Sequence, residues 1–195
     1  MSCAQSPPSG PGGLREELDR LDMAVYAAIA ATPTPALDRG LRRLSRAADH
    51  SKLWIGSAAL LAVAAGRPGR QAAVGGLAST AVTSTVVNLV FKPLGARRRP
   101  DRTAYQVPIA RQVTMPRSTS FPSGHAASAF AFATGVATVM PAAGVLLSAV
   151  ATLVAYSRVH TGVHYPSDVI AGSLIGTVLA PLTTAALARR SQRSG

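Results

Sequence analysis

The sequence is poor in charged residues, aromatic residues and cysteine. Only 14% of its 195 residues are charged, whereas soluble domains carry about 25%. Cys3 is the single cysteine, which excludes both a disulfide framework and a thiolate metal site. Aromatic residues make up 5% of the chain, and there is neither a base-reading basic helix nor the Cys/His spacing of a zinc finger. Nucleic acid is therefore not an expected partner.

What remains is a hydrophobic chain with an excess of positive charge. Hydrophobic residues make up 48% of the sequence and the formal net charge is +12. This combination is typical of a protein that avoids water over much of its length and binds anions elsewhere, such as a phospholipid surface or a phosphorylated substrate. Residues 1–13 lack the charged and then apolar pattern of a signal peptide and are expected to form a flexible tail.

Two segments of mixed polarity follow this tail. Residues 14–31 are predicted to form a helix that is acidic at first and apolar later. Residues 36–50 predict a basic amphipathic helix with Leu37, Leu41 and Leu44 on one face. Such a helix could lie in the membrane interface, or it could pack on the domain and leave its basic face in solvent.

Five apolar segments predict an all-α, membrane-embedded bundle of five to six helices over residues 53–188. Together with residues 14–50 they form a single domain of residues 14–190, followed by a basic tail of residues 191–195. Three segments are shorter than the roughly 20 residues that a membrane span requires, so a soluble all-α protein is the alternative. The segments cover residues 53–65, 72–91, 124–140, 142–156 and 169–188.

Charge and polarity interrupt this hydrophobic chain at residues 92–102, 120–125 and 157–168. If each apolar segment crosses the membrane once, the second ends and the third begins on the same side. The fourth returns to that side and the fifth leaves it. All three polar clusters are therefore expected at one end of the bundle, with a long polar loop between the second and third segments.

The residues in these clusters suit the binding of phosphate. Arginine binds phosphate oxygens through two parallel hydrogen bonds. Ser123 and Gly124 lie where an apolar helix is predicted to begin, and free backbone N–H groups at a helix start form a phosphate cradle. The cationic side chains in the clusters are Lys92, Arg97, Arg98, Arg99 and Arg158.

Two histidines and a carboxylate add the groups needed for catalysis. His125 and His164 carry imidazole groups, whose ordinary pKa lies near neutral pH. Asp168, four residues after His164, is placed to hold the Nδ1–H of its imidazole and leave Nε2 free to attack. His160 and His164 also have a spacing compatible with zinc, but no acidic partner or third ligand accompanies them. We therefore expect no metal.

At these positions the sequence resembles the type 2 phosphatidic acid phosphatase family, whose broader superfamily includes vanadium haloperoxidases. The first family motif, Lys followed after six residues by Arg-Pro, matches Lys92 and Arg99-Pro100. Residues 122–125 match the second motif, Pro-Ser-Gly-His. The third motif matches Ser157-Arg158, His164 and Asp168.

The resemblance implies a metal-independent and cofactor-free lipid phosphatase with its active site within residues 92–168. In such an enzyme His164 is the nucleophile, Asp168 orients it, and His125 is the general acid and base. The phosphoryl oxygens are held by Lys92, Arg99, Ser123, Gly124 and Arg158.

The expected substrate is a phosphorylated lipid in the cell membrane, which the chain is expected to cross several times. Candidate substrates are phosphatidic acid, phosphatidylglycerophosphate, a polyprenyl diphosphate and a polyprenyl-linked sugar phosphate. The alternative functions are a vanadium-dependent haloperoxidase and a non-catalytic lipid-binding membrane protein.

Overall fold

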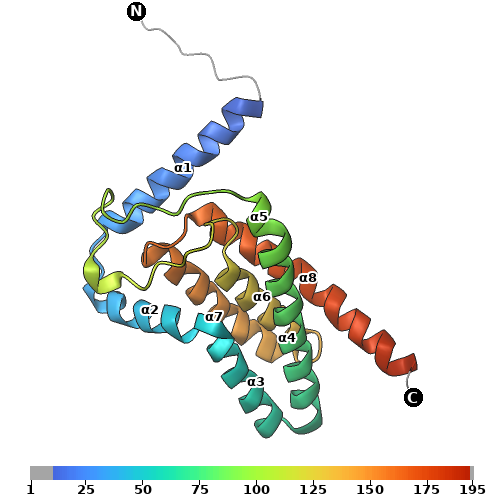
Figure 1. The fold of residues 1–195 in the computed structure, drawn as a ribbon. Coiled ribbons are helices and arrows are strands. Elements are labelled where there is room, and N and C mark those ends of the chain that lie inside the picture. The colour runs from blue at the N-terminus through green and yellow to red at the C-terminus, as the bar shows by residue number, and fades with distance from the viewer. Residues whose placement is uncertain (1–10, 194–195) are drawn as a thin grey trace, which may run out of the picture.

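A computed structural model describes residues 11–193, and in this range every regular element is helical (Figure 1). The predicted all-α class is confirmed. Residues 1–10 of the expected tail and residues 194–195 lie outside the described range, and residues 11–13 are helical. The α-helices are α1 (Pro11–Ala31), α2 (Pro35–Ala47), α3 (Lys52–Ala64), α4 (Gly66–Val86), α5 (Lys92–Leu94), α6 (Gly124–Ala137), α7 (Pro141–His160) and α8 (Pro166–Arg193).

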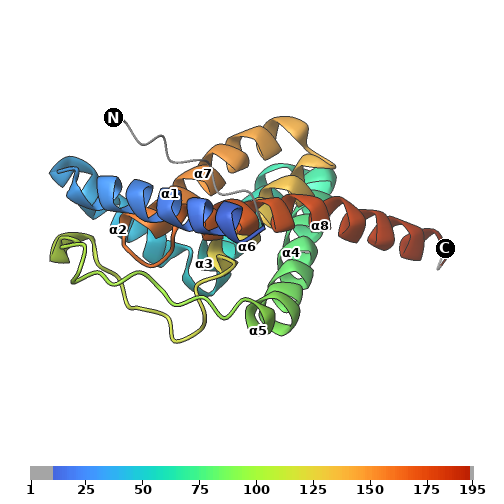
Figure 2. The same ribbon diagram turned by 90° about the horizontal axis from the view of Figure 1, so that it is seen from above.

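The centre of the bundle is α6, which packs against α4, α7 and α8. Alanines and Phe132 on α6 are fully buried, and Phe132 stacks at 5.4 Å, centroid to centroid, on the buried Trp54 of α3. The helix α3 itself packs on α4. In Figures 1 and 2, α1 lies at the end of the bundle where α8 begins, and its Tyr26 and Ala30 are buried in a second apolar cluster with residues of α6, α7 and α8.

Three helical segments are long and apolar enough to cross a membrane: Gly66–Leu94, Pro141–His160 and Pro166–Arg193. Large apolar side chains are exposed along all three, among them Val82, Leu89, Leu146, Leu153, Leu174 and Val178. A run of such side chains is stable when it faces lipid. The protein is therefore a membrane protein.

The other two predicted crossings, α3 and α6, are shorter. They contain 13 and 14 residues, or about 20 Å of helix against a hydrocarbon core of about 30 Å. The helix α6 is surrounded by α4, α7 and α8, so most of its surface contacts protein rather than lipid. These two helices are therefore not among the three segments that are long enough to count as candidate spans, and the crossing of the membrane by each apolar segment stays a prediction.

Two local predictions differ from the structure. The helix α4 begins at Gly66, six residues before the predicted start, because Pro68 lies in its first turn, where a missing N–H costs no hydrogen bond. On α2 the buried face consists of Asp38, Leu41 and Ser45, whereas Leu37 is exposed. Polar groups of α7 lie beneath α2, so its polar side chains face inward.

The predicted long polar loop is present as residues 95–123, with one 3-10 turn, η3 (Ile109–Arg111). Arg111 is buried and anchors this loop. Its guanidinium contacts Asp38 at 2.9 Å and donates to the carbonyl oxygens of Ile29 and Thr32 at the end of α1. The loop is thereby tied to both N-terminal helices.

Close packing between α6 and α8 depends on glycine. A Cβ atom built on Gly176 of α8 would overlap the backbone oxygen of Ala127 and lie 2.8 Å from the nitrogen of Ala131. Small residues at helix contacts are the usual way in which membrane helices approach each other closely. This contact matters for the site because Asp168 lies in the first turn of α8 and Gly124 begins α6.

We therefore expect Gly176→Ala to lower the free energy of unfolding by about 1–3 kcal/mol, since the added methyl group meets backbone atoms that cannot move aside. The measurement is thermal unfolding in detergent. Gly56→Ala on α3 is the control, because a Cβ there meets nothing within 4 Å. Equal melting temperatures for the two variants would contradict this account of the α6–α8 contact.

Candidate active site

The three polar clusters of the sequence meet at one end of the bundle. Arg99 of the long loop contacts His164, with 3.1 Å between Nη1 and Nε2. The backbone N–H of Ser123, which precedes α6, donates to the backbone oxygen of Asp168 on α8 at 2.9 Å. Residues far apart in the sequence therefore form one site, at the end where α4 finishes and α6 and α8 begin.

His164 and Asp168 form the buried part of this site. Their side chains are 2% and 0% exposed, and His164 Nδ1 lies 3.5 Å from Asp168 Oδ2. The same carboxylate oxygen accepts hydrogen bonds from the hydroxyl of Ser120 at 2.5 Å and from the backbone N–H of Tyr165 at 2.9 Å. A buried carboxylate needs such donors to remain ionised.

The contact with Arg99 defines the tautomer of His164. A guanidinium only donates hydrogen bonds, so the Nε2 atom that faces it has to be the acceptor and Nδ1 has to carry the proton. This tautomer directs N–H toward Asp168 and the lone pair of Nε2 toward the cationic side of the site. Burial, with Arg99 and Arg158 nearby, lowers the pKa of His164 to about 3 although Asp168 opposes the shift. The imidazole is therefore neutral near pH 7.

Arg99 is held in place by the loop around it. Its Nε donates to the backbone oxygen of Ser118 at 2.9 Å, and its Nη1 donates to that of Val163 at 2.7 Å. The hydroxyl of Ser118 also accepts a hydrogen bond from Lys92 Nζ at 3.0 Å. Ser118, which lies outside the predicted site, thus holds two of the predicted phosphate-binding cations side by side.

A π-helical turn, η2 (Val87–Phe91), separates α4 from Lys92. Such turns are often found at functional sites. A Cβ atom on Gly124 would lie 3.9 Å from Lys92 Nζ, so the start of α6 faces this ammonium group. Lys92, Gly124 and His125 line a cavity of about 220 Å³. Ser123 is buried, and its hydroxyl caps α6 by accepting from the N–H of Ala126 at 3.5 Å.

Arg158 lies between the two histidines. It is 1% exposed, and its charge acts on both His125 and His164. Its Nη1 donates to the hydroxyl of Ser45 on α2 at 2.6 Å, whereas its buried Nε has no hydrogen-bond partner in the described part of the chain. A buried guanidinium with a free N–H retains a donor for an anionic ligand.

His125 is paired with a residue that the sequence analysis did not assign to the site. Its Nε2 lies 2.8 Å from Oδ1 of Asp49, in the 3-10 turn η1 (Asp49–Ser51), and Asp49 is also 4.0 Å from Arg158. The hydrogen bond from His125 is the main cause that lowers the pKa of Asp49. Because a carboxylate only accepts, Nε2 carries a proton and Nδ1 is left to exchange the second one.

Arg97 is the second residue whose place the sequence did not define. Its Nη1 is 3.1 Å from Asp168 Oδ1 and 2.7 Å from Asp22 Oδ2, and its guanidinium lies 4.2 Å from the ring centroid of Tyr165. Asp22 also accepts hydrogen bonds from the side chain and backbone of Ser167. Arg97 therefore connects α1 to the carboxylate beside His164, whereas its neighbour Arg98 is exposed.

His160 lies outside this arrangement. Its Nε2 contacts Thr34 at 2.9 Å and Asp38 at 3.2 Å, which joins α7 to α2. Within residues 11–193 no group of three or more His, Cys, Asp or Glu side chains is arranged to hold a metal ion.

Comparison with known proteins places this geometry in a family. The family model of the PAP2 superfamily matches residues 73–192, a range that contains every residue of the three motifs. The chain is 35% identical over 170 residues to decaprenylphosphoryl-5-phosphoribose phosphatase of Mycobacterium tuberculosis, a match that covers 85% of this chain and 90% of that protein.

Two crystal structures share the fold. Aquifex aeolicus LpxE has a TM-score of 0.66 at 23% identity and covers 84% of this chain and 94% of its own. A transmembrane PAP2 type phosphatidylglycerolphosphate phosphatase from Bacillus subtilis has a TM-score of 0.63 at 21% identity, with coverages of 89% and 87%. The family model and the mycobacterial relative confirm the resemblance carried by the motifs: the chain belongs to the PAP2 superfamily.

Proposed function

We propose that the protein hydrolyses the terminal phosphate of a polyprenyl-linked sugar phosphate through a phosphohistidine on His164, in a cell membrane that it crosses several times. The protein is a lipid phosphatase of the PAP2 superfamily; the choice of lipid and the residue roles are what we add. The observation that carries the mechanism is the orientation of His164, with the acceptor Nε2 among cations and Nδ1–H toward Asp168.

In the first step Nε2 of His164 attacks phosphorus and the bond from phosphorus to the lipid oxygen breaks. His125, protonated, gives its proton to that leaving oxygen. The charge that develops on the imidazole ring of His164 is balanced by Asp168. The products are the dephosphorylated lipid and a phosphohistidine.

In the second step His125, now neutral, takes a proton from water as the water attacks the phosphohistidine. The nitrogen–phosphorus bond breaks, inorganic phosphate leaves, and His164 returns to its neutral form. The low pKa of His164 supports this role, because the histidine is unprotonated at the start of each cycle.

The phosphoryl oxygens are held by Lys92, Arg99 and Arg158, with the N–H of Gly124 at the start of α6. Ser123 supports this site by capping α6 with its hydroxyl. Cations and amides that are fixed before the reaction stabilise the transition state without rearrangement, and this is the charge neutralisation that a metal ion supplies in other phosphatases.

The choice of a polyprenyl-linked sugar phosphate rests on the mycobacterial relative, which matches most of this chain. The function is tested by phosphate release in detergent from decaprenylphosphoryl-5-phosphoribose, phosphatidic acid, phosphatidylglycerophosphate and a polyprenyl diphosphate. We expect the highest kcat/KM for the first substrate, unchanged activity in EDTA, and inhibition by vanadate, which resembles the phosphoryl transition state.

A higher kcat/KM for one of the other lipids would overturn the substrate assignment. Loss of activity in EDTA with recovery on adding Mg²⁺ or Zn²⁺ would overturn the metal-free mechanism. No phosphate release from any lipid in the panel, together with vanadate-dependent bromide oxidation by peroxide, would favour the haloperoxidase alternative.

His164→Ala is expected to lower kcat by about ten-thousand-fold or more, because no other group forms the covalent intermediate. Asp168→Asn is expected to lower kcat by about a hundred- to ten-thousand-fold, since the amide does not balance the charge of the imidazolium. Turnover and trapping of radioactive phosphohistidine from labelled substrate are the measurements. His160→Gln, four residues before the nucleophile, is the matched control and keeps turnover; normal turnover in His164→Ala would disprove the mechanism.

The pH dependence of kcat/KM tests the pair of His125 and Asp49. Burial lowers the pKa of His125, with Arg158 and Lys92 acting in the same direction, and Asp49 opposes them. Asp49→Asn removes the opposing charge, so His125 loses its proton at a lower pH. The alkaline limb of the pH profile is expected to move to lower pH by about one unit or more.

Asp101→Asn is the control for this shift. Asp101 caps its own turn in the long loop by accepting from the N–H groups of Thr103 and Ala104. An asparagine keeps those hydrogen bonds and removes the same charge. If the alkaline limb of Asp49→Asn stays in place or moves to higher pH, Asp49 does not set the protonation of His125.

A further inference from the structure

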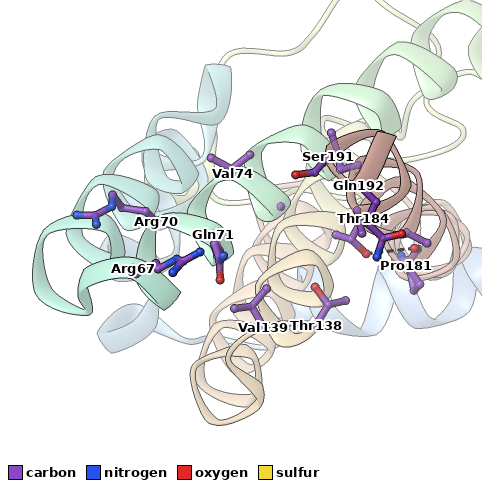
Figure 3. A pocket seen from close by; sticks show the side chains of 14 residues that line it. Arg67, Arg70, Gln71, Val74, Thr138, Val139, Pro181, Thr184, Ser191 and Gln192 are labelled. Carbon is purple, nitrogen blue, oxygen red and sulfur yellow. Dashed lines mark hydrogen bonds between the residues drawn. The ribbon is translucent and has the colours of Figure 1, made fainter. Parts of the chain in front are cut away.

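A groove of about 960 Å³ lies between the first turns of α4 and the last turns of α8 (Figure 3). The C-terminal turns of α8 extend away from the rest of the bundle (Figures 1 and 2), and Pro181 lies at the point where the groove begins on this helix. The turn between α6 and α7 contributes Thr138 and Val139. Further apolar lining comes from Val74, Ala185, Leu187 and Ala188.

The groove is at the end of the bundle opposite the active site. Along α4 and its continuation, Arg70 of the groove and Lys92 of the site are separated by about 33 Å of helix at 1.5 Å per residue. This matches the roughly 30 Å of the hydrocarbon core. When the active site lies at one headgroup layer, Arg70 lies at the other, and the apolar part of the groove opens into the opposite leaflet.

Two exposed arginines form the polar rim of the groove. Arg67 and Arg70 make no hydrogen bond or ion pair with any residue that the structure describes. No acidic residue occurs in the sequence between Asp49 and Asp101 or after Asp168. None of the residues that line the groove is acidic, so its lining does not neutralise the two guanidinium groups, and Gln71, Ser191 and Gln192 add neutral hydrogen-bonding groups beside them.

We propose that this groove binds one anionic phospholipid of the leaflet opposite the active site. Its phosphate contacts Arg67 and Arg70, and an acyl chain lies between α4 and α8. The two parts of the groove match the two parts of such a molecule, because arginine binds phosphate and membrane-facing basic residues attract anionic headgroups. The bound lipid fills the space that separates the end of α8 from α4.

A second copy of the chain fits the groove less well. In a two-fold dimer the same surface meets itself, so the arginines of both copies would come together with no acidic residue between them. A lipid phosphate brings the negative charge that the protein lacks there. The distance from the active site also separates this lipid from the substrate.

The test is native mass spectrometry of the purified protein in detergent, with equal amounts of phosphatidylglycerol and phosphatidylcholine. We expect one phosphatidylglycerol to be retained in preference to phosphatidylcholine. The double variant Arg67→Gln/Arg70→Gln is expected to retain it about 30-fold more weakly, at roughly 1 kcal/mol for each arginine near a charged headgroup. Ala185→Trp, at an exposed position in the groove wall, is expected to exclude it by filling the space.

The matched control is Arg39→Gln/Arg43→Gln, which removes two exposed arginines from α2. It should leave the retained phosphatidylglycerol in place.

Equal loss in both double variants, or equal retention of the two lipids by the unmodified protein, would overturn the proposal. A lipid-free dimer that Ala185→Trp converts to a monomer would show a second copy in the groove. Phosphate release from the lipid substrate in detergent verifies that each variant is folded.

Discussion

The buried carboxylate of Asp168 is the interaction on which the rest of the structure depends. It lies in the first turn of α8, has no exposed surface, and accepts hydrogen bonds from two segments: Arg97 and Ser120 of the long loop, and Tyr165 of the turn before α8. A charge in such a place is stable only when these donors are present together. A buried Asp168 carboxylate is therefore stable only when the long loop and the turn before α8 are both in place, and Asp22 of α1 completes the network through Arg97.

The arginines of the site are held in fixed directions by the protein around them. Backbone oxygens of Ser118 and Val163 hold Arg99, and the hydroxyl of Ser45 holds Arg158. These hydrogen-bond partners are neutral, so they fix the direction of each guanidinium without cancelling its charge, whereas the carboxylate of Asp49 lies 4.0 Å from Arg158. In the proposed mechanism, a phosphate group meets cations whose positions are already restricted, which reduces the reorganisation needed during catalysis.

The helices and the motif residues could be predicted from the sequence because both have a local signature. Apolar runs define the five bundle helices to within a few residues at most ends, and the fixed spacing of the motifs identifies Lys92, His125 and His164. Asp49 and Asp22 could not be found in this way. Asp22 is one of four acidic residues in α1 and Asp49 lies in a short 3-10 turn, and the importance of each arises only from the tertiary contact with Arg97 or His125. The inward face of α2 was missed for the same reason, since its polar residues are buried by partners on α7.

The π-helical turn before Lys92 bears on two features of the same helix: its apolar length and the direction of the Lys92 side chain at its end. An α-helix advances by about 100° per residue, so the direction of a side chain at its end depends on every residue before it. The residue that η2 inserts changes the direction of the side chains after it, so that Lys92 is directed at Gly124 at the end of a segment long and apolar enough to cross a membrane. Removing that one residue would turn Lys92 by about 100° around the helix axis, away from Gly124.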